Sequence, residues 1–320
     1  MFVPKILLDE AQKIVLLKIL WIMKKQLLFA IILLLAFITA KAQKPDTARM
    51  LIHYKFTWIR DTTNREHPLT ENMVLYIGQS AGAYRSYDAI VYNAQFKKAW
   101  AEAAAASPDG NVRINRRGVG TAIEYYQYPN NKRLARKEPL MMNSYLIEDT
   151  MPVIDWKTSS DTATFGGLHC QKATCHFKGR EYTAWFCPDL PIRVGPWKLN
   201  GLPGVIVDAS DSKNEVVFKF DGVEKATPTP TGNLPAVAEK DLPPILRGLN
   251  DDMNLIAAPP GTIKATQKEF DKARLAIIKN PNGVVEAINA SNGPKVDHIK
   301  GGPPLMGPVT NNPIELPEKK

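Results

Sequence analysis

The chain has 320 residues, of which 44% are hydrophobic and 23% charged, and its formal net charge at pH 7 is +9. This length suffices for one large domain or two small ones. The basic residues are spread along the chain, and the clusters Arg113–Arg117 and Lys132–Lys137 lack interleaved aromatic residues. We interpret both clusters as solvated loop or strand faces, which argues against a nucleic-acid-binding protein.

Residues 23–42 have the pattern of a cleavable secretory signal. Two lysines follow Met23, an apolar run covers Leu27–Ile38, and small residues flank Lys41. This pattern predicts cleavage before Gln43. The apolar run has about 12 residues, fewer than the roughly 20 needed to cross a bilayer, so a signal is favoured over a membrane anchor.

Removal of this leader changes the expected mature protein. Residues 1–22 fit neither a signal nor a folded domain, and we interpret Met23 as the true initiator. Residues 1–42 carry six lysines and two acidic residues, so the mature chain has an expected net charge of +5. After cleavage no transmembrane segment is expected.

We expect residues 43–292 to form a single domain that begins with strands. Met50–Arg60 alternates, and one of its faces carries Ile52, Tyr54, Phe56 and Trp58, which we assign to the core. Met73–Ile77 and Ala83–Tyr87 are typical of a hairpin of short strands. Further strands are predicted at three segments: Thr121–Tyr128, Leu140–Glu148 and Val153–Trp156.

Two helices are predicted. Residues 90–106 are rich in alanine, and Phe96 and Trp100 lie four residues apart. Thr266 and Glu269 form a capping box that opens a helix ending at Lys279. Its apolar stripe predicts packing on a sheet. After Glu224, prolines in 227–232 and at 243–244 indicate a linker or surface excursion. The tail, residues 293–320, should be mostly irregular except at Ile314–Leu316.

Two hairpins occupy the centre of the chain. Leu168–Phe177 and Tyr182–Phe186 flank a turn at Lys178–Glu181, and Gly204–Ala209 and Glu215–Val223 flank a second turn. We therefore predict an α+β fold: a large, curved, mainly antiparallel sheet with two packed helices. A half-open barrel resembling periplasmic lipid and lipoprotein carriers would suit this meander of strands.

The loop between the two hairpins contains Gly201-Leu-Pro-Gly-Val-Ile206. This segment resembles the core motif of the GLPGLI family of Bacteroidota, with Val205 in place of the leucine. Segments near Cys170 and Gly179, and Asn312–Leu316 near the end, resemble other parts of that family in the same order. The resemblance implies an exported, uncharacterised protein of the periplasm or cell surface.

The motif region has two physical readings. Its prolines fix φ and its glycines permit conformations closed to other residues, which indicates a rigid corner between the hairpins. The alternative is a loop at the rim of a binding mouth, with Arg193 and Trp197 facing a ligand or partner. The structural motif residues are Gly195, Pro196, Gly201, Leu202, Pro203 and Gly204.

Three cysteines invite a metal-site interpretation that strand geometry opposes. If Phe177 pairs with Tyr182, Cys187 faces Lys172 and lies diagonal to Cys170, with Cys175 on the opposite side. A cluster of ligands then fails, and no metal or cofactor is expected. In an oxidising compartment the better prediction is a Cys170–Cys187 disulfide, with Cys175 left free.

No catalytic motif is present, so no catalytic residue is assigned. The expected function is that of a non-catalytic binding or accessory protein of the periplasm or cell surface, which holds an apolar ligand or an envelope protein. A structural or assembly component without a small ligand is the alternative. An enzyme of unrecognised type ranks last.

Overall fold

The computed structural model describes residues 15, 17–18, 20–26, 45–107, 119–141, 143–227, 252–280 and 310–318. The chain divides into two units, Met1–Lys44 and Pro45–Lys320. In the first, the described residues are helical. Most of the predicted signal, its cleavage site, the cluster Arg113–Arg117 and the predicted linker beyond residue 227 lie outside the described residues. No helix in the described ranges combines the length and apolarity that a membrane span needs.

The second unit is built on a twelve-stranded sheet with the order β14-β7-β6-β5-β4-β3-β2-β12-β11-β10-β9-β8. All neighbours are antiparallel except β14, which runs parallel to β7. The strands are β2 (Met50–Trp58), β3 (Leu69–Ile77), β4 (Gly82–Ser86), β5 (Glu124–Tyr128), β6 (Arg133–Leu140), β7 (Asn143–Thr150), β8 (Lys157–Phe165), β9 (Leu168–Phe177), β10 (Arg180–Cys187), β11 (Val205–Asp211), β12 (Val216–Lys225) and β14 (Ile263–Ala265).

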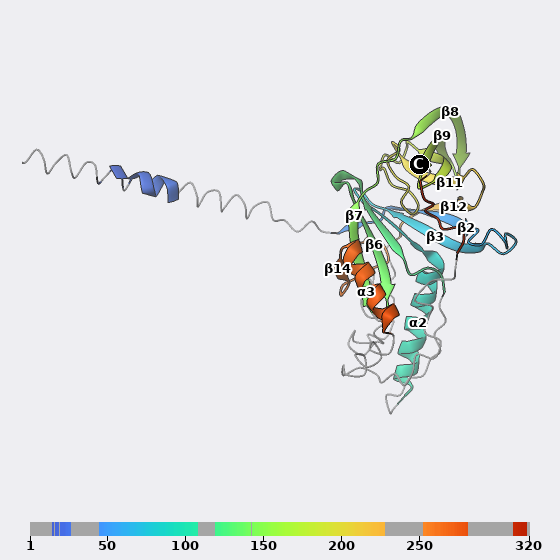
Figure 1. Ribbon diagram of the computed structural model, residues 1–320, viewed down its shortest axis with the longest axis horizontal. Coiled ribbons are helices and arrows are strands. Elements are labelled where there is room, and N and C mark those ends of the chain that lie inside the picture. Colours follow the sequence, from blue (N-terminus) through green and yellow to red (C-terminus); the bar gives the residue numbers. More distant parts are fainter. Residues whose placement is uncertain are drawn as a thin grey trace, which may run out of the picture. The chain divides into compact units, whose positions relative to one another are not determined.

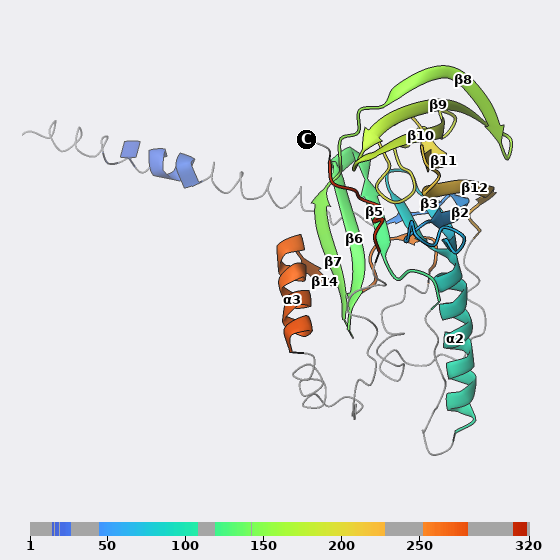
Figure 2. The same cartoon turned by 45° about the vertical axis from the view of Figure 1, so that its right-hand side comes forward.

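The remaining elements cover or extend this sheet. β1 (Asp46–Thr47) and β13 (Leu255–Ile256) form a separate two-stranded sheet. The helices are α2 (Tyr87–Ala105), the 3-10 turn η1 (Pro129–Asn131) and α3 (Gln267–Lys279). The sheet is strongly curved, and β8 and β9 arch over one end of it while α3 lies along β7 near the other (Figures 1 and 2). The predicted α+β class with a mainly antiparallel sheet is confirmed.

The central strand β2 is buried on both of its faces. Ile52 and Tyr54 are fully buried and Phe56 is 8% exposed, as the alternation predicts. Leu51, on the other face, is also buried. The two faces contribute to separate apolar clusters, one with Phe218 of β12 and one with Tyr126 of β5. Both faces of the central strands are therefore covered.

Both predicted helices are present, with local caps that explain where they begin. The Ser86 hydroxyl accepts a hydrogen bond from the Ala89 N–H at 3.0 Å, so α2 begins at Tyr87, a few residues earlier than predicted. The capping box of Thr266 and Glu269 is confirmed. Phe270 is buried and packs edge-on against Tyr145 of β7, which confirms that the apolar stripe of α3 faces the sheet.

Two sequence expectations are wrong, and one strand was not predicted. Val153–Trp156 is not a strand, because the Trp156 indole donates to the Asn200 carbonyl and directs this segment onto the loop between β10 and β11. Residues 133–140 form β6, and Lys137 of the basic cluster is a buried partner of Glu124 instead of a solvated residue. Strand β8 was missed because both of its faces are polar, so it has no alternation.

The C-terminal tail also departs from the prediction. Residues 310–318 are irregular, and Ile314–Leu316 forms no strand. The tail is nevertheless tied to the sheet: the Trp58 indole donates to the Asn312 carbonyl at 2.9 Å, and the Leu316 N–H to the Lys178 carbonyl at 3.0 Å. Residues 310–318 therefore join the domain that was expected to stop at residue 292.

Candidate functional site

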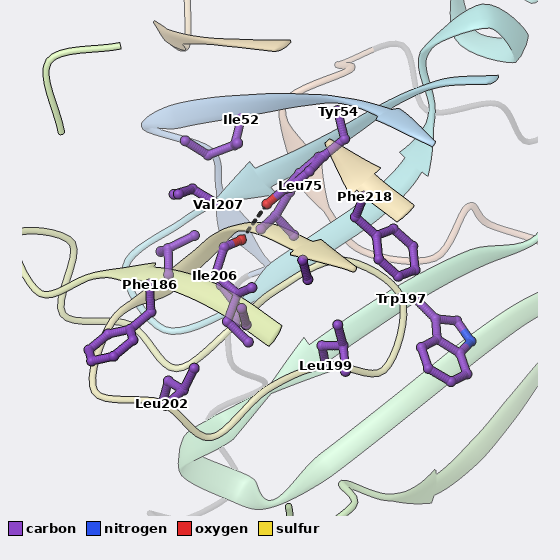
Figure 3. Close-up of a cluster of buried hydrophobic side chains, with 14 of the residues drawn as sticks. Ile52, Tyr54, Leu75, Phe186, Trp197, Leu199, Leu202, Ile206, Val207 and Phe218 are labelled. Atoms are coloured by element: carbon purple, nitrogen blue, oxygen red, sulfur yellow. Dashed lines mark hydrogen bonds between the residues drawn. The ribbon is translucent and has the colours of Figure 1, made fainter. Parts of the chain in front are cut away.

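The motif loop, residues 188–204 between β10 and β11, folds back onto the sheet. Leu199 and Leu202 are at most 1% exposed, and they lie among the side chains of the main apolar cluster (Figure 3). Trp197 is 4% exposed and stacks on Phe218, with ring centroids 6.4 Å apart and an interplanar angle of 14°. The loop therefore supplies core side chains to the same apolar cluster as its flanking strands β10 and β11.

The glycines of the motif are explained by backbone geometry. Gly201 has φ +96°, a conformation that side chains disfavour. A Cβ on Gly204 would lie 2.1 Å from the Cys187 carbonyl oxygen, so the chain returns to β11 in direct contact with the end of β10. Leu202 is buried between these two glycines, and Pro203 is exposed.

Side chains from distant strands hold the loop at its backbone. Gln127 of β5 is fully buried; its amide donates to the carbonyls of Gly195 at 2.8 Å and Trp197 at 3.0 Å. Its carbonyl oxygen accepts from the Gly195 N–H at 3.1 Å. The Tyr54 hydroxyl donates to the Ile206 carbonyl at 2.6 Å (Figure 3). Pro196 closes a turn, since its carbonyl accepts from the Leu199 N–H at 3.0 Å.

The two residues proposed for a binding rim are separated by this arrangement. Arg193 is exposed, but Trp197 is buried against Phe177 and Phe218. Trp197 therefore does not face a ligand, which corrects that part of the rim interpretation. The reading of the motif as a rigid corner accounts for its position, because an indole in the core anchors the loop.

A second group of polar residues is the Arg180 cluster: Arg180, Asp211, Glu215 and Asn312. Arg180 lies on β10 and Asp211 on β11, the two strands that flank the motif loop. The Arg180 side chain is 1% exposed. Its Nη1 lies 2.6 Å from Asp211 Oδ2 and 3.2 Å from Glu215 Oε2, and its Nη2 donates to Asn312 Oδ1 at 2.7 Å. Two further donations reach tail carbonyls, at Pro313 from Nη2 and at Ile314 from Nε. All three nitrogens of the guanidinium are thus engaged within the protein.

The acidic members of the cluster also bind the backbone. Asp211 Oδ1 accepts from the N–H groups of Glu215 and Val216, which closes the β11–β12 turn. Burial acts to raise the pKa of Glu215, but hydrogen bonds from Arg65, Arg180 and Asn312 outweigh it and hold the pKa below its usual value. Glu215 is therefore a carboxylate engaged with partners, not a proton donor.

A comparable cluster, the Arg85 cluster (Arg85, Glu124, Tyr126 and Lys137), lies toward the other edge of the sheet. Arg85 donates to the carbonyls of Met253 at 3.2 Å and Leu255 at 2.8 Å, so it holds the chain around β13. Burial acts to raise the pKa of Glu124, but Lys137 and Arg85 outweigh it and lower the pKa. This carboxylate too is committed to internal partners.

Most of these contacts have no signal in the amino-acid sequence. Gln127 lies between two tyrosines in a short strand, and its partners are about seventy residues away. Arg85 and Arg180 resemble ordinary strand residues. An arginine or glutamine in a strand flanked by aromatic residues is a weak indication of burial, and only the fold shows what it binds.

The cysteine register differs from the prediction. Tyr182 pairs with Cys175, and Phe186 with Gln171, because the β9–β10 turn has only two residues, Lys178 and Gly179, both with positive φ. The next position along the ladder brings Cys187 opposite Cys170. All three cysteines are buried thiols in this structure. Among the described residues, no three His, Cys, Asp or Glu side chains gather as metal ligands.

The fold and site define an α+β protein in which an internal loop motif completes the core of a twelve-stranded sheet. Residues 176–208 match the model of a family described as "Protein of unknown function (Porph_ging)". This match confirms the resemblance to the GLPGLI family over the segment that carries the motif.

Other comparisons add little. No curated protein matches the chain significantly. Two solved structures titled "Structure of PNGF-II" are similar to 70% of the chain, with TM-scores of 0.43 and 0.42 and sequence identities of 11% and 10%. The chain covers 32% of those proteins, about a third of their length.

Proposed function

We propose that this is a non-catalytic accessory protein of the bacterial envelope, in the periplasm or at the cell surface, that binds another protein. The observation that carries the proposal is the internal engagement of the motif region. Arg180 lies on β10, the strand that leads into the motif loop. Its guanidinium donates to two carboxylates, an amide and two carbonyls of its own chain. A group that stabilises charge in a substrate needs donors aimed at that substrate.

A carrier of an apolar ligand is the second candidate, because a curved sheet resembling the half-barrel of lipid and lipoprotein carriers could enclose one. Such a carrier needs an apolar cavity of several hundred Å³. In the part of the sheet next to the motif loop, Trp197, Leu199 and Leu202 occupy the apolar face (Figure 3). This favours a protein partner over a small apolar ligand.

The edge strand β8 supports a protein partner. It is the last strand of the twelve, and seven of its nine residues are exposed, mostly threonine and serine. The opposite edge differs, because β14 has only three residues and leads into α3. An exposed edge strand offers unpaired backbone groups to an extended segment of another chain. The pairing of β8 with β9 shifts register between Thr158 and Thr162. Residues 162–165 pair regularly with β9, so they form the regular part of the exposed edge.

Native mass spectrometry of the protein isolated from its own envelope fraction, combined with lipid extraction, tests the proposal. We expect a complex with a second protein and no bound lipid. A stoichiometric apolar molecule bound to the protein would instead establish the carrier.

A matched pair of variants separates edge binding from other contacts. Thr164→Lys places a charge on the exposed edge, and Thr174→Lys places the same charge at an exposed position of the neighbouring strand β9. We expect both variants to melt within a few degrees of the wild type, since exposed substitutions change stability by about 0.5 kcal/mol or less. Loss of the complex in Thr164→Lys alone supports the edge, and equal retention in both contradicts it.

A further inference from the structure

We propose that Cys170 and Cys187 are an oxidation site: they close to a cross-strand disulfide that joins β9 to β10 where the motif loop begins, while Cys175 stays a thiol. The inference rests on the strand register. It is independent of the proposed function, because it concerns two buried side chains and not the exposed edge strand.

The register decides whether the bond can form. The pairing expected from sequence made the two cysteines diagonal neighbours, whose Cα atoms lie about 7–8 Å apart, beyond the range of a disulfide. In the structure Phe186 pairs with Gln171, so the ladder continues to Cys187 opposite Cys170. Directly opposed residues have Cα atoms about 4.5–5.5 Å apart, within the range that disulfides adopt.

The local environment agrees with this placement. Each thiol influences the pKa of the other, as two neighbouring side chains do. Cys170 is 2% exposed and Cys187 is fully buried. Their flanking strands hold them there, since Cys170 also pairs with Ala163 of β8 and Cys187 with Val205 of β11.

Cys175 is excluded by the same ladder. It pairs with Tyr182, and it lies five residues from Cys170 along β9. Because side chains alternate between faces along a strand, the two cysteines point to opposite sides of the sheet. Its burial at 4% exposure also removes it from solvent.

The chemistry is a thiol–disulfide exchange with an oxidised dithiol such as oxidised glutathione. One cysteine thiolate attacks the oxidant and releases one reduced thiol, and the second cysteine then displaces the other. The two cysteines lose two protons and two electrons, and the oxidant's disulfide becomes two thiols. Burial raises the pKa of Cys170 to about 12 and also raises that of Cys187, so the thiolates needed are scarce once the protein has folded. We therefore place the reaction before or during folding.

Refolding under redox control tests the site. The reduced, denatured protein is refolded in a mixture of oxidised and reduced glutathione, then denatured and alkylated without reductant, and its peptides are mapped. We expect one alkylated cysteine per chain, Cys175. Alkylation of all three cysteines, or a disulfide that includes Cys175, would overturn the proposal.

Two variants keep the result interpretable. Cys175→Ala should refold with no alkylatable thiol, whereas Cys170→Ala should leave Cys187 labelled. Wild type refolded with glutathione should melt about 6–12 °C above wild type refolded in reductant, from the stabilisation typical of a loop of this size. The same comparison in Cys170→Ala should show no difference, and an equal difference there would contradict a bond between these residues.

Discussion

Two buried arginines organise opposite halves of the sheet in different ways. Arg180 of β10 binds two carboxylates, Asn312 and two carbonyls of the C-terminal tail, and its side chain is 1% exposed. Arg85 of β4 also reaches carbonyls of a distant segment, but it meets one carboxylate, Glu124, at 3.4 Å. Among the described residues its Nε has no hydrogen-bond partner, although its guanidinium lies over the rings of Tyr76 and Tyr126.

The two arginines differ in whether the carboxylates that contact them keep another cation when the arginine is removed. Asp211 and Glu215 both contact the Arg180 Nη1 in a buried site, whereas Glu124 keeps Lys137 at 2.5 Å if Arg85 is lost. Burial of a charge without a partner costs several kcal/mol, while replacement of one of two partners costs less. The half of the sheet that carries the motif loop should therefore depend more on its arginine.

Arg180→Leu should have the largest effect. It leaves Asp211 without its cation and removes the anchor of the tail, and we expect a loss of about 3–5 kcal/mol in the free energy of unfolding. Denaturant unfolding measures it. Arg65→Leu is the matched control: it removes another cation from Glu215, but its side chain is 46% exposed, so about 1 kcal/mol or less should be lost. Equal losses would remove the distinction between the buried and surface cations.

Arg85→Leu should cost less, about 2–3 kcal/mol. The main loss is of the charge-assisted hydrogen bonds from the Arg85 guanidinium to the partly buried carbonyls of Met253 and Leu255. The same unfolding experiment applies. If Arg85→Leu destabilises the protein more than Arg180→Leu, the contrast between the two clusters is wrong.

Asn312→Ala tests the tail directly. Its side chain bridges Arg180, the Ile59 carbonyl at 2.8 Å and Glu215 at 3.0 Å, and we expect a loss of about 1–2 kcal/mol. Asn311→Ala is the control, because Asn311 is exposed and its hydrogen bonds to Asp61 and Thr62 are at the surface. Its effect on thermal unfolding should be smaller by at least half.

His176 should give the smallest effect, and a pH-dependent one. It lies between Glu181 at 2.6 Å and Glu318 of the tail at 2.7 Å, and hydrogen bonds to these two carboxylates raise its pKa. Lys178 also interacts with Glu318 and helps to lower the pKa of that carboxyl. Stability from a raised histidine pKa is fully present below its unfolded pKa of about 6.5 and is lost as pH rises through the higher folded value.

The wild type should therefore exceed His176→Gln in melting temperature by more near pH 5.5 than near pH 8.5. These two pH values lie about one to two units on either side of the reference histidine pKa of about 6.5. His169→Gln is the control, since the His169 side chain is 85% exposed and its carboxylate contact, Asp189 at 3.5 Å, is exposed too. A difference between wild type and His176→Gln that grows toward high pH would contradict this sign.

The parts of the fold that were predictable depend on local periodicity. The alternation of Met50–Trp58 and the capping box at Thr266 are short-range signals, and both led to the observed elements. Strand β8 has no apolar face, and residues 151–156 contain apolar residues that bind a loop, so periodicity misled in both places. Burial against a distant segment overrides a local pattern.

The register of the central hairpin shows a second limit. A shift by two residues keeps every side chain on the same face, so the apolar pattern of β9 and β10 fits both the expected and the observed pairing. The turn decided the register: Lys178 and Gly179 both have positive φ, as a two-residue type I′ hairpin turn requires. The candidate site was predictable as a motif, but the roles of Gln127, Arg85 and Arg180 depend on partners far away in the sequence.

Hydrogen exchange of the motif loop tests the central claim most directly, that residues 188–204 are part of the core. The bonded amides of Gly195 and Leu199 should exchange as slowly as those of β2 and β12, through global unfolding, because Gln127 and the apolar side chains of the loop hold them. Exchange of these amides that is orders of magnitude faster than in the strands would contradict the claim and indicate a mobile binding rim.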